Sequence, residues 1–183
     1  AGFNLIDTAD SYSRWVPGNP GGTAETVMGK WLKQNGHTRD QVIWATKGRS
    51  SMGDGPNDGG ASRVHLAKAL DDSLRRMQTD YVDLYQIHWP DYDTPHEETL
   101  RALDDMVRVG KVRYIGSSNF HAGQVADAAW TARTTNLNPF ISAQNDYSLL
   151  ERDVVTELVP AFLELVVGLL SYFPVAMVLT IGI

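Results

Sequence analysis

The sequence predicts an α/β fold of the (β/α)8 TIM-barrel type, here as an incomplete barrel of about six βα units in a single domain over residues 1–183. Six short apolar runs recur along the chain, and stretches with helical periodicity separate them. Each run ends in an isolated polar or aromatic residue. No run is followed by G-x-G-x-x-G, the dinucleotide fingerprint of the doubly wound sheet, which favours the barrel.

The six apolar runs are the predicted strands. They cover residues 3–6, 42–46, 82–87, 112–117, 141–143 and 169–172. Parallel strands of a barrel all end at one face, so the polar residues at or just past their ends should lie on that shared face. These residues are Asp7, Lys47, His88, Asn119, Gln144 and Tyr172. One ring of strand ends could therefore hold a whole active site.

The first two predicted helices begin at capping residues and continue with apolar periodicity. Thr23 is expected to cap a helix over 23–35, with Glu25 near its positive end. Its predicted apolar face consists of Val27, Met28, Trp31 and Leu32. Ser62 is expected to start a helix to Met77, whose buried stripe would be Leu66, Leu70, Leu74 and Met77. Two loops, 17–22 and 53–60, are rich in Gly and Pro and should lie over the strand ends.

The later helices have equally specific signals. Thr94, Pro95 and Glu97 predict a capping box at the start of a helix that ends at Gly110. A helix is expected over 122–132, and another over 152–165. Pro160 lies inside the last of these and predicts a kink there.

Composition excludes several classes of function. Sixteen Lys and Arg against twenty-two Asp and Glu give a net charge of −6, so no broad basic surface is available for nucleic acid. The chain has no cysteine, which excludes disulfides and thiolate metal sites and permits a reducing compartment, so we expect a cytoplasmic protein with no secretory leader. Residues 165–183 carry no charge, but Pro174 interrupts them. A buried strand and the start of another element explain this segment better than a membrane span.

Four residues form the candidate catalytic group, namely Asp7, Tyr12, Lys47 and His88. Singly, each has a common structural explanation: a turn residue, a packing aromatic, a solvated charge or a core histidine. Together, they suit proton transfer to a developing alkoxide. A tyrosine hydroxyl is a poor acid at neutral pH without a neighbouring cation, which Lys47 would supply, with Asp7 as its counter-charge. His88 could then hydrogen-bond an incoming carbonyl oxygen.

The order of motifs resembles the aldo-keto reductase family over nearly the whole chain. The quoted motifs are Asp7-Thr8-Ala9-Asp10-Ser11-Tyr12, Ala45-Thr46-Lys47, Asp83-Leu84-Tyr85-Gln86-Ile87-His88, Gly116-Ser117-Ser118-Asn119-Phe120, the segment 144–150 that begins at Gln144, and Tyr172-Phe173-Pro174. Six motifs in the family's order are far more specific than any one of them.

The resemblance implies reduction of an aldehyde or ketone by NADPH, with no metal ion. Tyr12 would be the general acid, Lys47 and Asp7 its tuning pair, and His88 the group that orients the carbonyl. The side chains of Ser118, Asn119 and Gln144 would bind the nicotinamide carboxamide, and Tyr172 would stack on the nicotinamide ring. The alternative role of Ser118 and Asn119 is a helix cap, which is compatible with cofactor binding.

Compared with the family, the chain begins at the second strand and stops after the seventh-strand motif. We expect the first and eighth strands and the loop for the adenosine 2′-phosphate to be missing, as in a partial product of a longer gene. Exposed sheet edges then predict marginal stability or self-association. Two alternatives stay open: a non-catalytic cofactor-binding or regulatory subunit, and an inactive truncated fragment. A metal-dependent hydrolase is disfavoured, because His88 and Asp91 have no further histidine at another strand end. The carbonyl substrate and the choice of NADPH over NADH are left open.

Overall fold

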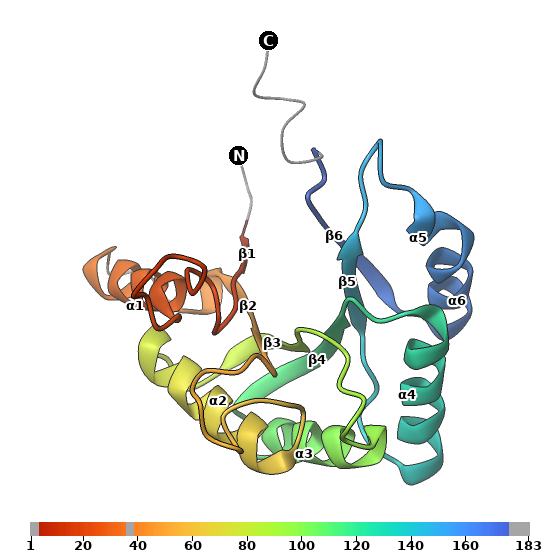
Figure 1. The fold of residues 1–183 in the computed structure, drawn as a ribbon, viewed down its shortest axis with the longest axis horizontal. Helices are drawn as coiled ribbons and strands as arrows, with labels where there is room; N and C mark the ends of the chain where they lie inside the picture. The colour runs from red at the N-terminus through yellow and green to blue at the C-terminus, as the bar shows by residue number, and fades with distance from the viewer. Residues whose placement is uncertain (1–3, 36–38, 176–183) are drawn as a thin grey trace.

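The computed structural model describes residues 4–35 and 39–175 of the 183-residue chain. Its centre is a six-stranded sheet in which β1 to β6 lie in sequence order (Figure 1). The strands are β1 Leu5–Asp7, β2 Ile43–Gly48, β3 Val82–Ile87, β4 Val112–Ser118, β5 Ser142–Asp146 and β6 Gly168–Tyr172. The helices are α1 Thr23–Asn35, the 3-10 helix η1 Arg39–Gln41, α2 Arg63–Met77, α3 His96–Arg108, α4 Ala122–Thr135, α5 Asp153–Thr156 and α6 Leu158–Leu165.

All neighbouring strands pair in parallel, which confirms the predicted α/β class. The sheet curves, and the helices lie along its outer side (Figure 1). Within the described residues β1 and β6 do not pair with each other, so the sheet is an open half-barrel. The register places Lys47 of β2 beside Gln86 of β3, and Ser118 of β4 beside Gln144 of β5. The predicted site residues therefore share one end of the sheet.

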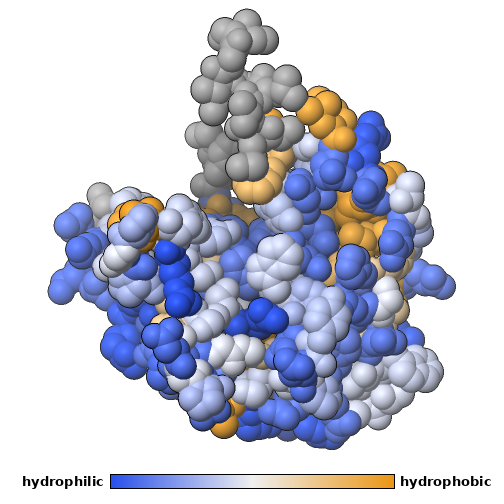
Figure 2. All heavy atoms as spheres, in the orientation of Figure 1, coloured by the Kyte–Doolittle hydropathy of each residue, from blue (hydrophilic) through white to orange (hydrophobic). Residues whose placement is uncertain are grey.

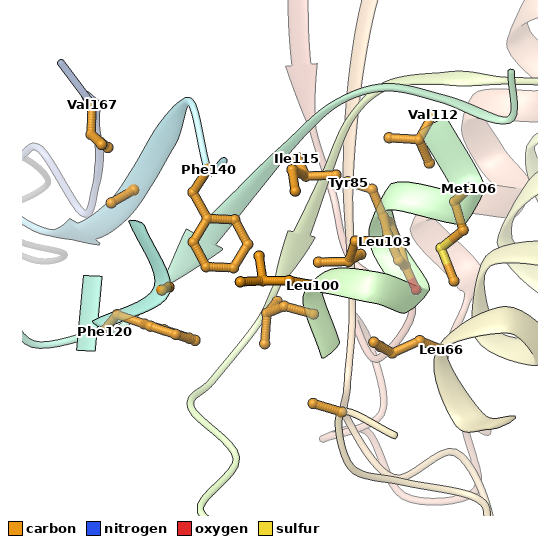
Figure 3. Close-up of a cluster of buried hydrophobic side chains, with 14 of the residues drawn as sticks. Leu66, Tyr85, Leu100, Leu103, Met106, Val112, Ile115, Phe120, Phe140 and Val167 are labelled. Atoms are coloured by element: carbon orange, nitrogen blue, oxygen red, sulfur yellow. The ribbon is translucent and has the colours of Figure 1, made fainter. Parts of the chain in front are cut away.

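The core lies between the curved sheet and the helices that cover it, as Figure 3 shows for the layer around α3. The predicted stripe on α2 is confirmed: Leu66, Leu70, Leu74 and Met77 are all buried. Ser62 caps this helix, because its Oγ accepts a hydrogen bond of 3.4 Å from the backbone N of His65. The sequence therefore identified the face of α2 that packs on the sheet.

Helix α1 packs differently from its prediction. Val27, placed on the apolar face, is 59% exposed, whereas Glu25 is fully buried. The Glu25 carboxylate accepts from Thr46 Oγ1 of β2 and pairs with Arg76 Nε of α2, each at 2.6 Å. Gly29 lies where an added Cβ would come within 2.4 Å of the Arg76 carbonyl oxygen. The buried ion pair and the close backbone contact determine which face of α1 turns toward the sheet. Apolar periodicity alone predicted a different face.

Two expected helix features have different outcomes. The prediction of a capping box at Thr94 is wrong. Thr94 Oγ1 donates to Asp91 Oδ2 at 2.8 Å, and Pro95 occupies the N-cap position of α3 without a side-chain hydrogen bond to the helix. The Thr94 hydroxyl is therefore directed to Asp91 rather than to the first turn of α3. The interruption predicted from Pro160 is present, because α5 ends at Thr156 and α6 starts at Leu158. A proline has no N–H to donate to the carbonyl four residues earlier, which here belongs to Thr156.

The strand boundaries shift modestly. β1 covers Leu5–Asp7, and residue 3 of the predicted run lies outside the described residues. β5 runs on to Asp146, so Gln144 lies within the strand rather than past its end. Pairing with β6 accounts for the extension, since Gln144 is opposite Leu170 and Asp146 opposite Tyr172.

Apolar side chains gather on the surface near α5, α6 and the end of β6 (Figure 2). The strongly exposed ones there are Leu149, Leu150, Leu163, Val166, Phe173 and Val175. No helix in 4–35 or 39–175 is long and apolar enough to cross a membrane. The predicted new element after Pro174 falls largely on 176–183, which lie outside the described residues.

The open edges predict self-association of this chain through β1 and β6. A parallel strand edge presents unpaired backbone N–H and C=O groups, and lysine on an edge discourages pairing. Leu5, 45% exposed on β1, is the place for such a charge. We expect sedimentation to show oligomers, and Leu5→Lys to shift the distribution toward monomer. Val109→Lys, at a 68% exposed position next to α3, is the matched control and should change nothing. A monomer with a cooperative melt would contradict this prediction.

Candidate active site

The ammonium of Lys47 is the centre of the candidate site. Lys47 is 1% exposed, and its Nζ donates to Asp7 Oδ2 at 2.6 Å and to the Thr8 carbonyl at 2.8 Å. Its third contact is Tyr12 Oη at 3.0 Å. The other Asp7 oxygen accepts from Gln86 Nε2 of β3 at 3.2 Å. A buried charge requires this complete set of partners, and the sheet register supplies it.

Tyr12 reaches Lys47 because the chain turns sharply after β1. The backbone N of Asp10 donates to the Lys47 carbonyl at 3.1 Å, which holds the loop against β2. The backbone N of Tyr12 then donates to the Ala9 carbonyl at 3.3 Å and closes the turn. The phenol therefore points back over the end of β2. The sequence prediction that Tyr12 and Lys47 converge agrees with this geometry.

His88 completes the group on the far side of Tyr12. The two ring centroids are 5.9 Å apart in an edge-to-face arrangement. Nδ1 of His88 lies 3.4 Å from Ser11 Oγ and 3.3 Å from Ser50 Oγ. Burial, together with the charges of Lys47 and Arg49, lowers the pKa of His88 to about 4. The imidazole is therefore neutral at pH 7 and can offer a ring N–H to a carbonyl oxygen.

The four predicted cofactor-binding residues lie together at the ends of β4, β5 and β6. Asn119 Nδ2 donates to the His88 carbonyl at 2.9 Å, and Asn119 Oδ1 accepts from Tyr172 Oη at 2.7 Å. Ser118 Oγ donates to the Gln144 carbonyl at 3.0 Å. Asn119 thus links the catalytic group to β6. Its backbone adopts φ 61°, a left-handed conformation that asparagine tolerates.

A cleft of about 580 Å³ opens beside this network. Asn119 and Tyr172 form part of its lining, and Arg49, Trp89 and Tyr92 contribute another part. Trp89 stacks on His88 at a ring-centroid distance of 6.4 Å. The cleft therefore lies next to His88 through Trp89 and is lined by two of the predicted nicotinamide residues, and its volume is that of a small-molecule site.

The residues present fit a nicotinamide group. No hydrogen bond of the Gln144 side-chain amide occurs among the described residues, and the buried Asn145 Oδ1 also lacks a partner. These amides offer the donors and acceptors that a carboxamide needs. Tyr172, at the edge of the cleft, offers an aromatic face. Among the described residues no group of three or more His, Asp or Glu side chains could hold a metal ion.

Sequence reasoning assigned no role to three site residues. Gln86 lies in a quoted motif, but its bond to Asp7 follows only from the register of β2 and β3. Arg49 follows Lys47 by two positions and lines the cleft. Asp10, two residues before Tyr12, is fully buried, and burial together with the Glu25 carboxylate raises the pKa of Asp10 to about 7. Of these three residues, only Arg49 could have been identified from the sequence, because it lies just past a predicted strand end.

The depressed pKa of His88 is directly measurable. Proton NMR should show its ring titrating near pH 4, well below the ordinary value of 6.5, and His88→Asn identifies the resonance by its loss. Between these pH values the unfolded chain binds a proton that the folded chain does not. This site therefore lowers stability as the pH falls from about 6.5 to about 4. A titration midpoint above pH 6 would contradict the burial argument.

Asp10 should make stability depend on pH with the opposite sign. Its carboxyl ionises near 3.8 when unfolded and near 7 when folded, so in this window the unfolded state loses a proton that the folded state keeps. Stability from this site falls as the pH rises. As the pH rises from 4 to 7, we expect the free energy of unfolding of Asp10→Asn to increase relative to that of wild type by on the order of 2–4 kcal/mol. Urea unfolding at several pH values measures this difference. For Asp127→Asn, at an exposed position on α4, the plot of unfolding free energy against pH should run parallel to that of wild type. A parallel curve for Asp10→Asn would refute the prediction.

Comparison with known proteins agrees with this geometry. The model of the Aldo/keto reductase family matches residues 1–180. The chain is 40% identical to the uncharacterized oxidoreductase YrpG of Bacillus subtilis (strain 168), over 96% of this chain and 54% of that protein. It is 36% identical to the versiconal hemiacetal acetate reductase of Aspergillus parasiticus, again over 96% and 54%.

A third relative is the probable voltage-gated potassium channel subunit beta of Oryza sativa subsp. japonica, 36% identical over 96% of this chain and 52% of that protein. The chain spans about half the length of the curated relatives that it matches. The family model covers nearly all of the chain, and the chain belongs to the aldo/keto reductase family.

Proposed function

We propose that this protein reduces an aldehyde or ketone to an alcohol, with NADPH as hydride donor and Tyr12 as general acid. One observation supports the proposal above the others: the Lys47 ammonium lies 3.0 Å from Tyr12 Oη, while the neutral His88 ring lies edge-to-face with the same tyrosine. A carbonyl oxygen between Tyr12 and His88 would meet two hydrogen-bond donors. Such an arrangement stabilises negative charge developing on that oxygen.

Each side chain has a distinct part in the reaction. Bound NADPH would supply the hydride for the carbonyl carbon. Tyr12 donates its hydroxyl proton to the carbonyl oxygen as the C=O π bond breaks, which yields the alcohol and leaves a phenolate. The Lys47 ammonium stabilises that phenolate until a proton from solvent restores the hydroxyl. Asp7 neutralises Lys47 and fixes its direction, through their 2.6 Å ion pair.

His88 orients the substrate rather than transferring a proton. With its pKa lowered to about 4, the ring is neutral at working pH. The hydroxyls of Ser11 and Ser50 lie near Nδ1, so donation from a hydroxyl leaves the ring hydrogen on Nε2. Nε2–H would then donate to the carbonyl oxygen.

The network around Asn119 would hold the nicotinamide. The Gln144 amide and the side chains of Ser118 and Asn119 would bind its carboxamide, and the Tyr172 ring would stack against it. The Tyr172 hydroxyl donates to Asn119 at 2.7 Å, which fixes the edge of the ring and hence the plane available for stacking. This contact supports a defined face for hydride transfer.

A second function is favoured by the relatives. The probable voltage-gated potassium channel subunits beta of Oryza sativa subsp. japonica and of Arabidopsis thaliana are 36% and 35% identical to this chain. A non-catalytic subunit that binds the cofactor and regulates a partner is therefore the second proposal. It needs the cofactor network around Asn119 but not proton transfer by Tyr12.

Replacing Tyr12 separates these functions. Tyr12→Phe removes the proton donor and keeps the ring, and we expect turnover of 4-nitrobenzaldehyde, followed by NADPH absorbance, to fall by about 10²–10⁴. NADPH binding, followed by its fluorescence, should be unchanged. Tyr114→Phe, at a 57% exposed position on β4, is the matched control and should retain full activity.

The outcomes distinguish the three possibilities. Turnover that survives Tyr12→Phe would remove the general-acid role. Cofactor binding without turnover in the wild-type chain would favour the regulatory subunit. A chain that neither binds NADPH nor melts cooperatively would be an inactive fragment.

A further inference from the structure

We propose that Arg49 makes this site selective for carbonyl substrates that bear an anionic group, a carboxylate above all. The inference rests on the proposed function and specifies its substrate class. Arg49 would bind the anionic group in the 580 Å³ cleft while the carbonyl lies between Tyr12 and His88.

The Arg49 side chain has unused binding capacity. Its Nε is buried without a hydrogen-bond partner, and no ion pair or hydrogen bond of its guanidinium occurs among the described residues. Asp91 lies nearby, but its carboxylate already accepts from Ala61 N at 2.6 Å, Asp93 N at 3.1 Å and Thr94 Oγ1 at 2.8 Å. The charges of Arg49 and Asp91 attract each other, but no hydrogen bond joins them, so a bound anion would reduce the cost of the partly buried guanidinium.

The backbone at Arg49 is also strained. Its φ is 98°, a conformation that L side chains rarely adopt, and the Arg49 carbonyl accepts from Gly60 N at 2.9 Å. Glycine would adopt this conformation freely, whereas any other residue is strained in it. Strain of this kind is found mainly at functional sites. Here it places a guanidinium at the edge of the cleft.

The rest of the cleft suits an extended or aromatic substrate with one charged end. Trp89 and Tyr92 are 50% and 80% exposed and give apolar walls beside Arg49. The lining also includes three carboxylates, those of Asp146, Glu151 and Asp153. Arg49 is the one arginine or lysine among the described residues that line the cleft. An anion is therefore repelled from the carboxylate side and attracted to Arg49, which fixes the orientation of the substrate.

A phosphate of the cofactor is the other source of an anion. The position of Arg49 favours the substrate, because the preceding residue, Gly48, accepts a hydrogen bond of 3.0 Å from the backbone N of His88, whose ring would bind the carbonyl. Trp89 stacks on the same ring and lines the same cleft. Tyr172 and the carboxylates lie on the cofactor side of the lining. The experiment below includes a separate arm for the phosphate.

The test compares two planar ligands of equal shape, 4-carboxybenzaldehyde and its uncharged analogue 4-nitrobenzaldehyde. Binding is measured without cofactor by isothermal titration calorimetry, so turnover is not needed. We expect wild type to bind the carboxylate about tenfold more tightly than the nitro compound, the effect of one charge-assisted hydrogen-bonded pair. Arg49→Gln should abolish the preference, and Arg49→Lys should retain part of it. Arg133→Gln, which removes an exposed charge on α4, is the matched control and should keep the preference.

Further measurements keep the proposal falsifiable. Arg49→Gly removes the charge and relaxes the strained backbone, so loss of the preference in this variant cannot be assigned to misfolding. Equal binding of the two aldehydes by wild type, or a preference that survives Arg49→Gly, would overturn the proposal. Weaker NADPH binding by Arg49→Gln with an unchanged carboxylate preference would assign Arg49 to the cofactor phosphate instead. An Arg49-dependent preference in a chain without reductase turnover would uphold the inference while the proposed function fails.

Discussion

The Lys47 ammonium imposes the constraint on which the site depends. It is buried, and an ammonium has three hydrogens to donate. Those three are satisfied by Asp7 Oδ2, the Thr8 carbonyl and Tyr12 Oη. Loss of any partner would leave part of a buried charge without compensation, which proteins tolerate poorly. The tyrosine is therefore held in position by the same requirement that keeps the lysine charged and buried.

A second buried ion pair has a comparable effect in the helical layer. Glu25 of α1 is bound by Thr46 of β2 and by Arg76 of α2, so one carboxylate connects the first two βα units. Thr46 directly precedes Lys47 in β2, and its side chain points to the opposite side of the sheet, as alternation in a strand requires. The two charged clusters lie on either side of the same strand. Together they fix β2 between the catalytic group and the helices.

The charges near the site give His88, Lys47 and Arg49 different properties. The burial of the His88 ring and the two cations near it lower its pKa and keep the imidazole neutral, which leaves a ring N–H available to donate a hydrogen bond. The Lys47 ammonium has a full set of hydrogen-bond partners, whereas the Arg49 guanidinium makes no hydrogen bond or ion pair within the described residues. The first cation therefore serves the protein's own tyrosine. The second is available to a ligand.

The sequence by itself determined the class of fold and the order of elements, and it identified the residues of the candidate catalytic group. Apolar runs, helical periodicity and the capping serine Ser62 are local signals, and parallel strands bring their ends together wherever such units repeat. Only the tertiary structure decided the burial of Glu25 and the hydrogen bond from Thr94 to Asp91. It also decided that the Arg49 guanidinium has no hydrogen-bond partner among the described residues. Each depends on which distant polar groups meet after packing. Periodicity reports whether a side chain faces the core, but a buried charge is stable only where a partner from another element lies within hydrogen-bond distance.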